Sequence, residues 1–381
     1  MKNVYLDNAA TTQVREEVIE KMQKALKDYY GNPSSTYSYG RTSKTAVESA
    51  RKTIAKELKA HPSEIIFTSG GTEADNMILK SAVRDLGVEK IITSRIEHHA
   101  VLHTAQDLAK EYNTALEFVD LDGDGVPQLP HLEQLLQEDG TKKLVSLMYV
   151  NNEIGNILPI DRVAEMCRVN SALFHSDTVQ AIGHYGLDVT KTPIDFMAAS
   201  AHKFHGPKGV GFAFVRRNHA LKPLISGGGQ ERGLRAGTES VHNIVGLEEA
   251  FKLAYENLEK EQAYIEELKR YFIDSLTESI PDVVFNGLSG SMGKSTYTLV
   301  NIGLPISDDK TKMFLFNLDM EGVACSKGSA CQSGSDTGSH VLNQLSRGEG
   351  PRTSLRFSFS TYNTTQELDY AIGVLKQLVG A

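Results

Sequence analysis

The lysine at position 203 stands in an unusual setting. It lies in the stretch SAHKFHGPKGVG (200–211), after the apolar segment 196–199 and within a turn rich in glycine and proline. Most lysines are solvated surface charges, so a surface position is the default expectation for Lys203 as well. A lysine can also form a Schiff base with a carbonyl group. Which description applies depends on the groups that the fold brings to it.

A candidate anion site precedes this lysine in the chain. In the segment SGGTEA (69–74), the turn 69–71 connects a predicted strand (64–68) to a predicted helix that begins at Thr72. Glycines in such a turn let backbone N–H groups face an anion at the positive end of the helix, and Thr72 adds a hydroxyl donor. Taken alone, a tight turn in which Thr72 caps the helix explains the same residues.

A carboxylate ends another predicted strand. The segment 172–177, ALFHSD, ends in Asp177, and Gln180 follows three residues later. Parallel sheets place their ligands at the carboxyl ends of the strands. An anion cradle, a strand-end aspartate and a loop lysine are the parts that a pyridoxal phosphate (PLP) site requires. The cradle holds the phosphate, the aspartate keeps the pyridine nitrogen protonated, and the lysine forms the Schiff base.

Ordered motifs run through nearly the whole chain. They are YLDNAATT (5–12), GNPSS (31–35), FTSGGTEADN (67–76), EHHAVL (97–102), VNNEIGN (150–156), HSDTVQAIG (175–183), SAHKFHGPKGVG (200–211), GGGQERGLRAGT (227–238), GSAC (328–331) and LRFSFSTYNT (355–364). In these motifs the chain resembles the cysteine desulfurases of the NifS/IscS type, within the class V aminotransferases. The resemblance implies a PLP-dependent homodimer that converts L-cysteine to L-alanine and keeps the sulfur as a persulfide. An iron–sulfur scaffold, another acceptor protein or a low-molecular thiol would then take the sulfur.

The resemblance assigns roles to the candidate site residues. It implies that Lys203 binds the cofactor covalently and later carries the proton at the substrate Cα. Asp177 is the implied pyridinium partner, and His98 the imidazole stacked over the ring and a candidate acid or base. Arg356 is the implied bidentate clamp on the substrate α-carboxylate. The other implied contacts are Gln180 and Asn152 to the phenolic oxygen of the ring, Asn152 also to the substrate, Gly71, Thr72, Ser200 and His202 to the phosphate or near the ring, and Thr238 to the phosphate from the neighbouring subunit.

The three cysteines differ in their surroundings. A lone cysteine is most often a small buried hydrophobe, which suits Cys167 in the helical pattern 163–167. It does not suit Cys331, because its neighbours in 327–335 are mostly small and polar. The resemblance implies that the Cys331 thiolate attacks the substrate sulfur, whereas Cys325 is expected to be structural.

Two alternatives to a desulfurase stay open. A selenocysteine lyase or another class V PLP enzyme, such as an aminotransferase, would use the same fold, although Cys331 argues against an aminotransferase. A non-catalytic binding module is the second alternative. The intact set of Lys203, Asp177, His98 and Arg356 argues against it.

Strands and helices have to position these groups. Short apolar strands alternate with helical patterns from about residue 15 to 250. This alternation predicts an α/β fold with a mostly parallel sheet flanked by helices, and the resemblance implies the type I fold of PLP-dependent transferases. We expect strands at 64–68, 90–93, 115–119 and 144–150, and a helix at 46–59. The expected domains are an N-terminal arm (1–14) packing with the small domain, a large PLP-binding domain (15–250) and a small α+β C-terminal domain (251–381) that carries the catalytic cysteine.

Composition limits the class of protein. Lys plus Arg number 40 and Asp plus Glu 48, a net charge of −8, which argues against a nucleic-acid or anionic-membrane binder. Three cysteines in a chain this long indicate a reducing compartment without a disulfide framework. The first residues lack the apolar region of a signal peptide, so a cytoplasmic protein is expected. His98, His99 and His103 lack a cysteine or paired carboxylates nearby, so no metal site is expected.

Overall fold

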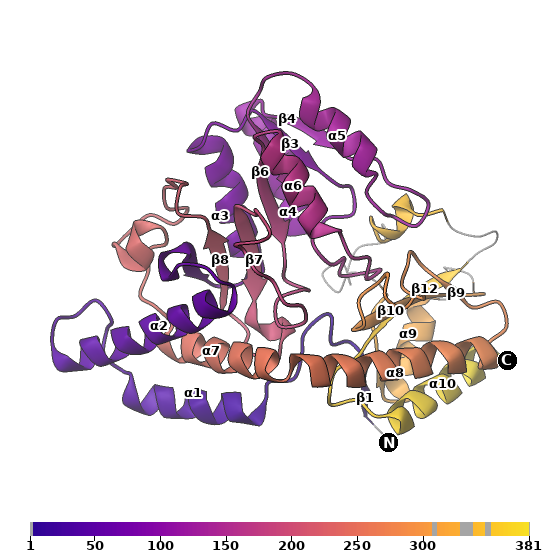
Figure 1. The fold of residues 1–381 in the computed structure, drawn as a ribbon. Helices are drawn as coiled ribbons and strands as arrows, with labels where there is room; N and C mark the ends of the chain where they lie inside the picture. Colours follow the sequence, from indigo (N-terminus) through magenta and orange to yellow (C-terminus); the bar gives the residue numbers. More distant parts are fainter. Residues whose placement is uncertain (1–2, 307–310, 328–337, 347–351, 381) are drawn as a thin grey trace.

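The computed structural model describes residues 3–306, 311–327, 338–346 and 352–380. Figure 1 shows a larger part built around a central sheet and a smaller part that contains β9, β10, β12 and helices α8 to α10. Both chain termini lie at the smaller part.

The larger part is organised by a seven-stranded sheet with the order β2-β8-β7-β6-β5-β3-β4. Neighbours from β7 through β4 pair in parallel, whereas β8 runs antiparallel to both β7 and β2. The expectation of a mostly parallel α/β sheet flanked by helices is therefore confirmed. The strands are β2 (Ile65–Thr68), β3 (Lys90–Thr93), β4 (Ala115–Phe118), β5 (Lys143–Ser146), β6 (Leu173–Asp177), β7 (Phe196–Ser200) and β8 (Gly211–Val215).

Helices cover both faces of this sheet, and alternate strand residues pack on opposite sides. On β6, Phe174 belongs to the core that α2, α6 and α7 share, whereas Leu173 packs with the core of α3 and α4. Because side chains alternate along a strand, His175 and Asp177 point to the α3 side. The helices of this part are α1 (Glu16–Asp28), α2 (Ser38–Glu57), α3 (Gly71–Arg84), α4 (His99–Tyr112), α5 (Leu129–Gln137), α6 (Ile160–Val169) and α7 (Val241–Glu256).

Two predicted elements have different bounds. The predicted helix 46–59 begins earlier, at Ser38, and it ends before Lys59, whose φ of 57° is incompatible with a right-handed helix. The predicted strand 144–150 ends at Ser146. The reason is a local change of partner, because the N–H of Met148 donates to the carboxylate of Glu97 and not to a strand (3.0 Å).

The smaller part has its own sheet and core. Strand β10 (Leu299–Leu304) pairs antiparallel with β12 and β9. Residues such as Phe272, Ile302 and Phe357 are fully buried in a core that also takes up Val4 and Leu6 from the N-terminus. The other elements are β9 (Val284–Phe285), β12 (Thr353–Ser358), α8 (Leu258–Ser279), α9 (Thr311–Met320), α10 (Thr365–Val379) and the parallel pair β1 (Val4–Tyr5) and β11 (Val323–Ala324).

We propose the division into an arm (1–14), a large domain (15–250) and a small domain (251–381). It is supported by the separate cores, one with members from Val18 to Ala254 and the other with members from Ile265 to Leu375 plus the arm. The arm also contacts the large domain, because the N–H of Thr12 donates to the carbonyl of His202 in the turn after β7 (2.9 Å).

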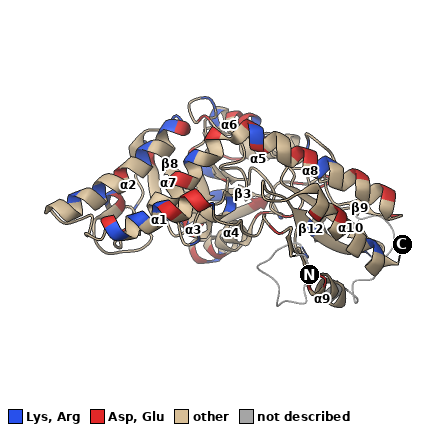
Figure 2. Ribbon diagram, turned by 90° about the horizontal axis from the view of Figure 1, so that it is seen from below, with Lys and Arg blue, Asp and Glu red and all other residues tan. Residues whose placement is uncertain are grey.

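Charged residues of both signs alternate along the surface helices. Figure 2 shows blue and red segments following one another on α1, α2 and α8, with no face of a single sign along them. Within the described part of the chain, no helix has the length and apolar character needed to cross a bilayer.

Candidate active site

A cavity of about 490 Å³ opens at the carboxyl ends of β6 and β7, beside the N-terminal arm. Asp177 and Ser200, the last residues of these two strands, both line it. The cavity brings together most of the residues singled out in the sequence. Those that line it are Gly71, Thr72, His98, Asn152, Asp177, Gln180, Ser200, His202, Lys203 and Arg356.

Lys203 enters the cavity from a short turn after β7. The turn is the 3₁₀ helix η2 (Ala201–Lys203), and it is tight, because a Cβ at Gly206 would lie 2.9 Å from the Cβ of Ala201. The Nζ of Lys203 donates to the carbonyls of Ala9 (2.5 Å) and Ala10 (2.9 Å). The default expectation of a solvated surface lysine is therefore wrong, since Lys203 is half-buried with its amino group held by the arm.

The N-terminus of α3 forms one end of the cavity. Its N-cap, Gly70, has a φ of 154°, which side chains rarely allow, and a Cβ at Gly71 would lie 2.5 Å from Cγ2 of Val179. The first-turn N–H groups of a helix have no partner inside it, and the helix end carries a partial positive charge. With Thr72, Ser200 and His202 lining the same cavity, this end can hold an anion such as a phosphate.

A salt bridge fixes the turn before α3. Glu73 accepts from the N–H of Ser69 (2.8 Å) and from Nε of Arg235 (2.8 Å). Burial alone would raise the pKa of Glu73, but the hydrogen bonds from Arg235 and Ser69 lower it. The pair thus ties the loop that carries Arg235 to the anion-binding end of the cavity.

Asp177 lines the cavity and is buried. It is 5% exposed, and its Oδ1 accepts from the N–H of Val179 (2.9 Å). Burial raises the pKa of Asp177 to about 6, although that hydrogen bond and the charge of Lys203 act in the other direction. A cation bound against this carboxylate would lower the pKa again.

His98 and His202 are neutral donors or acceptors at neutral pH. Burial, helped by the charge of Lys203, lowers the pKa of each to about 4. His98 is the N-cap of α4, and its Nδ1 accepts from the N–H of Ala100 (3.2 Å), which places the proton on Nε2. The neutral imidazole of His98 is thereby held at the cavity wall in one tautomer.

Arg356 is 1% exposed and comes from β12, which pairs with β10 in the sheet of the small domain. Its guanidinium donates to the carbonyl of Asn152 (2.7 Å) and to Oδ1 of Asp7 (2.8 Å). Its Nε–H is buried and has no partner among the described residues. Arg356 lines the cavity, and a rigid guanidinium there suits the binding of a carboxylate.

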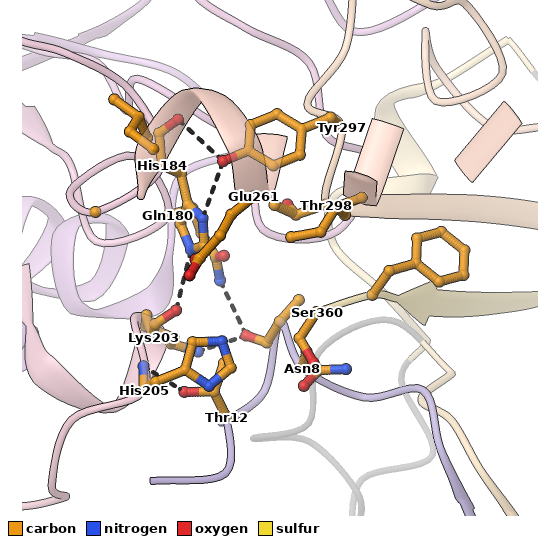
Figure 3. Close-up of a pocket in the computed structure, with 15 residues that line it drawn as sticks. Asn8, Thr12, Gln180, His184, Lys203, His205, Glu261, Tyr297, Thr298 and Ser360 are labelled. Carbon is orange, nitrogen blue, oxygen red and sulfur yellow. Dashed lines mark hydrogen bonds between the residues drawn. The ribbon is translucent and has the colours of Figure 1, made fainter. Parts of the chain in front are cut away.

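A second, much smaller cavity of about 20 Å³ lies behind Lys203 (Figure 3). There Nε2 of His184 hydrogen-bonds the carbonyl of Lys203 (3.0 Å), and the hydroxyl of Tyr297 donates to the carbonyl of His184 (3.0 Å). The side-chain amide of Gln180 donates to Ala9 (2.9 Å), the same carbonyl that holds Nζ of Lys203. The volume suffices for about one water molecule, so this region is a packed support of the Lys203 turn.

One predicted site residue, Thr238, is exposed and absent from the walls of this cavity. Another, Cys331, lies outside the described residues. Of the other cysteines, Cys167 is 1% exposed, and Cys325 packs against the core of the small domain. Burial raises the pKa of both thiols. These surroundings favour structural roles for Cys167 and Cys325.

Sequence reasoning missed several groups at this site. The carbonyls of Ala9 and Ala10 and the carboxylate of Asp7 belong to the motif YLDNAATT, which was matched without a role for any residue. Asp75 lines the cavity and is 1% exposed, but it stood unnoticed in the motif FTSGGTEADN. A carboxylate one helical turn after a glycine-rich strand end, among apolar neighbours, is the signal that could have found it.

Comparisons with known proteins agree with this geometry. The sequence profile of the family described as aminotransferase class-V matches residues 4–371. A curated relative from Dictyoglomus turgidum, named cysteine desulfurase IscS, is 40% identical over 381 residues, which cover 99% of this chain and 95% of the relative.

Solved structures give the same grouping. A NifS-like protein is 34% identical, with a TM-score of 0.90 and full coverage of both chains. SspA in complex with cysteine is 31% identical, with a TM-score of 0.81 over 95% of this chain and 100% of that one. The fold is that of the type I PLP-dependent transferases, and the chain belongs to the class-V aminotransferase family, within its NifS/IscS branch.

Proposed function

We propose that this protein is a PLP-dependent cysteine desulfurase, which converts L-cysteine to L-alanine and collects the sulfur for iron–sulfur cluster or thio-cofactor assembly. The observation that carries the proposal is one cavity in which a lysine, a buried carboxylate, a helix N-terminus and a guanidinium converge. Support comes from the full-length relative named cysteine desulfurase and from a 31% identical structure in complex with cysteine.

The residues present fit PLP as the cofactor. The N-terminus of α3, with Gly70, Gly71 and Thr72, lines the cavity and suits a phosphate, because the first N–H groups of a helix have no partner inside it. The buried carboxylate of Asp177, which accepts from the N–H of Val179, suits a protonated ring nitrogen. Lys203 supplies the amino group for a covalent link, and Ser200, His202, Gln180 and Asn152 supply polar contacts around the ring.

When bound, PLP supplies an electron sink for the negative charge that develops at the substrate Cα. Arg356 binds the α-carboxylate and thereby orients the Cα–H bond. Lys203 takes the proton from Cα and returns it there at the end of the reaction. His98, a neutral imidazole with its proton on Nε2, lines the cavity and can hold or donate a proton there.

The sulfur step belongs to Cys331. Its thiolate attacks the sulfur of the substrate, a sulfur–sulfur bond forms and the Cβ–S bond breaks, and the electron pair left at Cβ takes up a proton. The product is a persulfide on Cys331 and, after protonation at Cα, L-alanine. The attacking species has to be a thiolate, because a neutral thiol is a weak nucleophile.

We also propose a homodimer in which Thr238 reaches the phosphate of the neighbouring subunit. Two observations support this proposal. Thr238 is exposed and does not line the cavity of its own subunit. It also lies three residues after Arg235, whose salt bridge with Glu73 fixes the position of this loop. A low-molecular thiol, a scaffold protein or another acceptor takes the sulfur from Cys331.

Product analysis of the PLP-loaded protein tests the proposal. Incubation with L-cysteine and a reducing thiol should release alanine and sulfide in equal amounts. A selenocysteine lyase would prefer L-selenocysteine strongly and would keep its activity in Cys331→Ala. Formation of a keto acid in place of alanine would identify an aminotransferase.

A further inference from the structure

Two fully buried ionisable side chains lie next to each other at the cavity, and one of them, Asp75, lines it. Asp75 of α3 is 1% exposed and His175 of β6 is 0% exposed. The Oδ1 of Asp75 and the Nε2 of His175 are 3.3 Å apart, and neither atom has another hydrogen-bond partner among the described residues. On its other side, Nδ1 of His175 lies 2.8 Å from the hydroxyl of Ser146. A buried carboxyl among the apolar neighbours of α3 is unfavourable without a partner, so this arrangement needs an explanation.

The position of His175 connects this pair to Asp177. His175 and Asp177 are two residues apart on β6 and therefore point to the same side of the sheet, toward α3. Asp75 lines the same cavity as Asp177. Three causes raise the pKa of Asp75: burial contributes most, the charge of Asp177 comes second and the charge of Glu97 third. The two aspartates therefore compete for protonation, because two neighbouring carboxylates cannot both stay ionised in a buried site.

Hydrogen-bond partners decide which aspartate carries the proton. Asp177 accepts from the N–H of Val179 (2.9 Å), and Lys203 lies nearby, so its ionised form is stabilised. Asp75 faces Nε2 of His175 (3.3 Å), and burial lowers the pKa of His175 to about 3, so this ring is neutral. When its proton is on Nδ1, directed at the hydroxyl of Ser146, Nε2 is an acceptor that only a protonated Asp75 can use. Burial raises the pKa of the third carboxyl, Glu97, to about 8, although its hydrogen bonds from Ser94 and Met148 act in the other direction.

We propose that Asp75 and His175 form a positioning pair that holds one proton on Asp75 and thereby keeps Asp177 ionised for the ring nitrogen of the cofactor. The inference rests on the proposed function, since it assigns the role of the pair toward PLP. The hydrogen bond runs from the carboxylic acid of Asp75 to His175 and from Nδ1–H of His175 to Ser146. The pair has no net charge and leaves Asp177 as the carboxylate available to a cation in the cavity.

A double-mutant cycle on cofactor affinity tests this role. The affinity of the cofactor-free protein for PLP is measured at pH 7 for the wild type, His175→Phe, Asp75→Asn and the double variant. A second series uses 1-deaza-PLP, in which a carbon replaces the ring nitrogen. In His175→Phe the proton on Asp75 loses its acceptor and shifts toward Asp177, so PLP affinity should fall about tenfold, the equivalent of about one pKa unit. The affinity for the deaza analogue should stay within about threefold of the wild type.

The double variant separates this role from simple packing. Asp75→Asn removes the competing carboxyl at nearly the same volume and should bind PLP within about threefold of the wild type. Adding His175→Phe to Asp75→Asn should lower PLP affinity by no more than about a further threefold, because the carboxyl whose proton could move to Asp177 is no longer present. Equal losses for PLP and its deaza analogue, or an undiminished loss in the Asp75→Asn background, would overturn the proposal.

Other outcomes are equally informative. If His175→Phe does not fold, Asp75→Asn alone decides, because a tenfold or larger loss of PLP affinity there would mean that Asp75 acts as an anion. If His175→Phe folds and binds PLP like the wild type, the pair has no influence on Asp177. A wild-type protein that binds no PLP would refute the proposed function itself, which is distinguishable from all these results.

Discussion

Replacement of Arg356 by lysine is the sharpest probe of substrate recognition. The side chain is 1% exposed and is held by the carbonyl of Asn152, by Asp7 and by the hydroxyl of Ser326. Lysine keeps the positive charge and can replace one of these contacts, but it has no planar fork. The variant should therefore bind the α-carboxylate through one charged hydrogen bond in place of two.

The loss of one hydrogen bond sets the size of the expected rise in the KM for L-cysteine. A hydrogen bond to a charged group contributes about 1.5–3 kcal/mol, and about 1.4 kcal/mol is a factor of ten in an equilibrium constant. The KM for L-cysteine should therefore rise roughly 10- to 150-fold in Arg356→Lys. PLP affinity should change by less than about threefold, because most of the proposed phosphate and ring contacts come from α3, β6, β7 and η2 and not from the strand that carries Arg356.

Steady-state kinetics and cofactor titration measure both effects. Arg352→Lys is the matched control, because Arg352 comes from the same segment but donates to the carbonyl of Asp282 and lines a different cavity. An unchanged KM in Arg356→Lys would refute the reasoning. A raised KM in Arg352→Lys would identify Arg352 as the carboxylate-binding residue instead.

The remaining predictions concern the cofactor, the cysteines, the phosphate site and pH. Borohydride should fix PLP covalently to the wild type and not to Lys203→Ala; a lysine-linked cofactor in that variant would contradict the assignment. Cys331→Ala should bind PLP and L-cysteine yet release almost no sulfide, whereas Cys325→Ala should be nearly unaffected; the opposite pattern would assign the sulfur to Cys325. Glu73→Gln should weaken PLP binding about three- to tenfold, since the turn before α3 loses its ion pair with Arg235, and an unchanged affinity would show that the pair does not support the phosphate site. The free energy of unfolding of the cofactor-free protein should decrease as the pH falls from about 6.5 to about 4. His98, His202 and His205 have pKa values of about 4 in the folded state, so the unfolded chain binds more protons in that range. Urea unfolding at both ends of the range measures the free energy of unfolding. Equal values would mean that the effect of the three histidines is cancelled by Asp177 and Glu97, whose raised pKa values act in the opposite direction.

Much of this architecture could be predicted from local patterns. Strands such as β3 and β6 are short apolar runs that end in polar residues, and their ends carry the ligand-binding groups in a parallel sheet. The sequence placed Asp177 and Lys203 on consecutive strand ends, and the structure brings both to one cavity. The start of α2 could not be predicted in this way, because the helix extends back to Ser38 through polar residues without a periodic apolar pattern.

Local sequence patterns do not predict contacts between residues that lie far apart in the chain. No local signal indicates that the carbonyls of Ala9 and Ala10 hold Lys203, nearly 200 positions later, or that Asp7 pairs with Arg356. The partnership of Asp75 with His175 is hidden for the same reason, since a helix and a strand meet only after the sheet has formed. These contacts depend on tertiary packing and had to be read from the structure.

Peptide mass analysis of Cys331 tests the central claim most directly. The PLP-loaded protein is incubated with L-cysteine labelled with a heavy sulfur isotope, without reductant, and is then alkylated and digested. We predict that the peptide containing Cys331 gains one labelled sulfur atom in amounts matching the alanine released, and that Lys203→Ala shows no such gain. Alanine release with an unmodified Cys331, or labelled sulfur on Cys325 alone, would contradict the account.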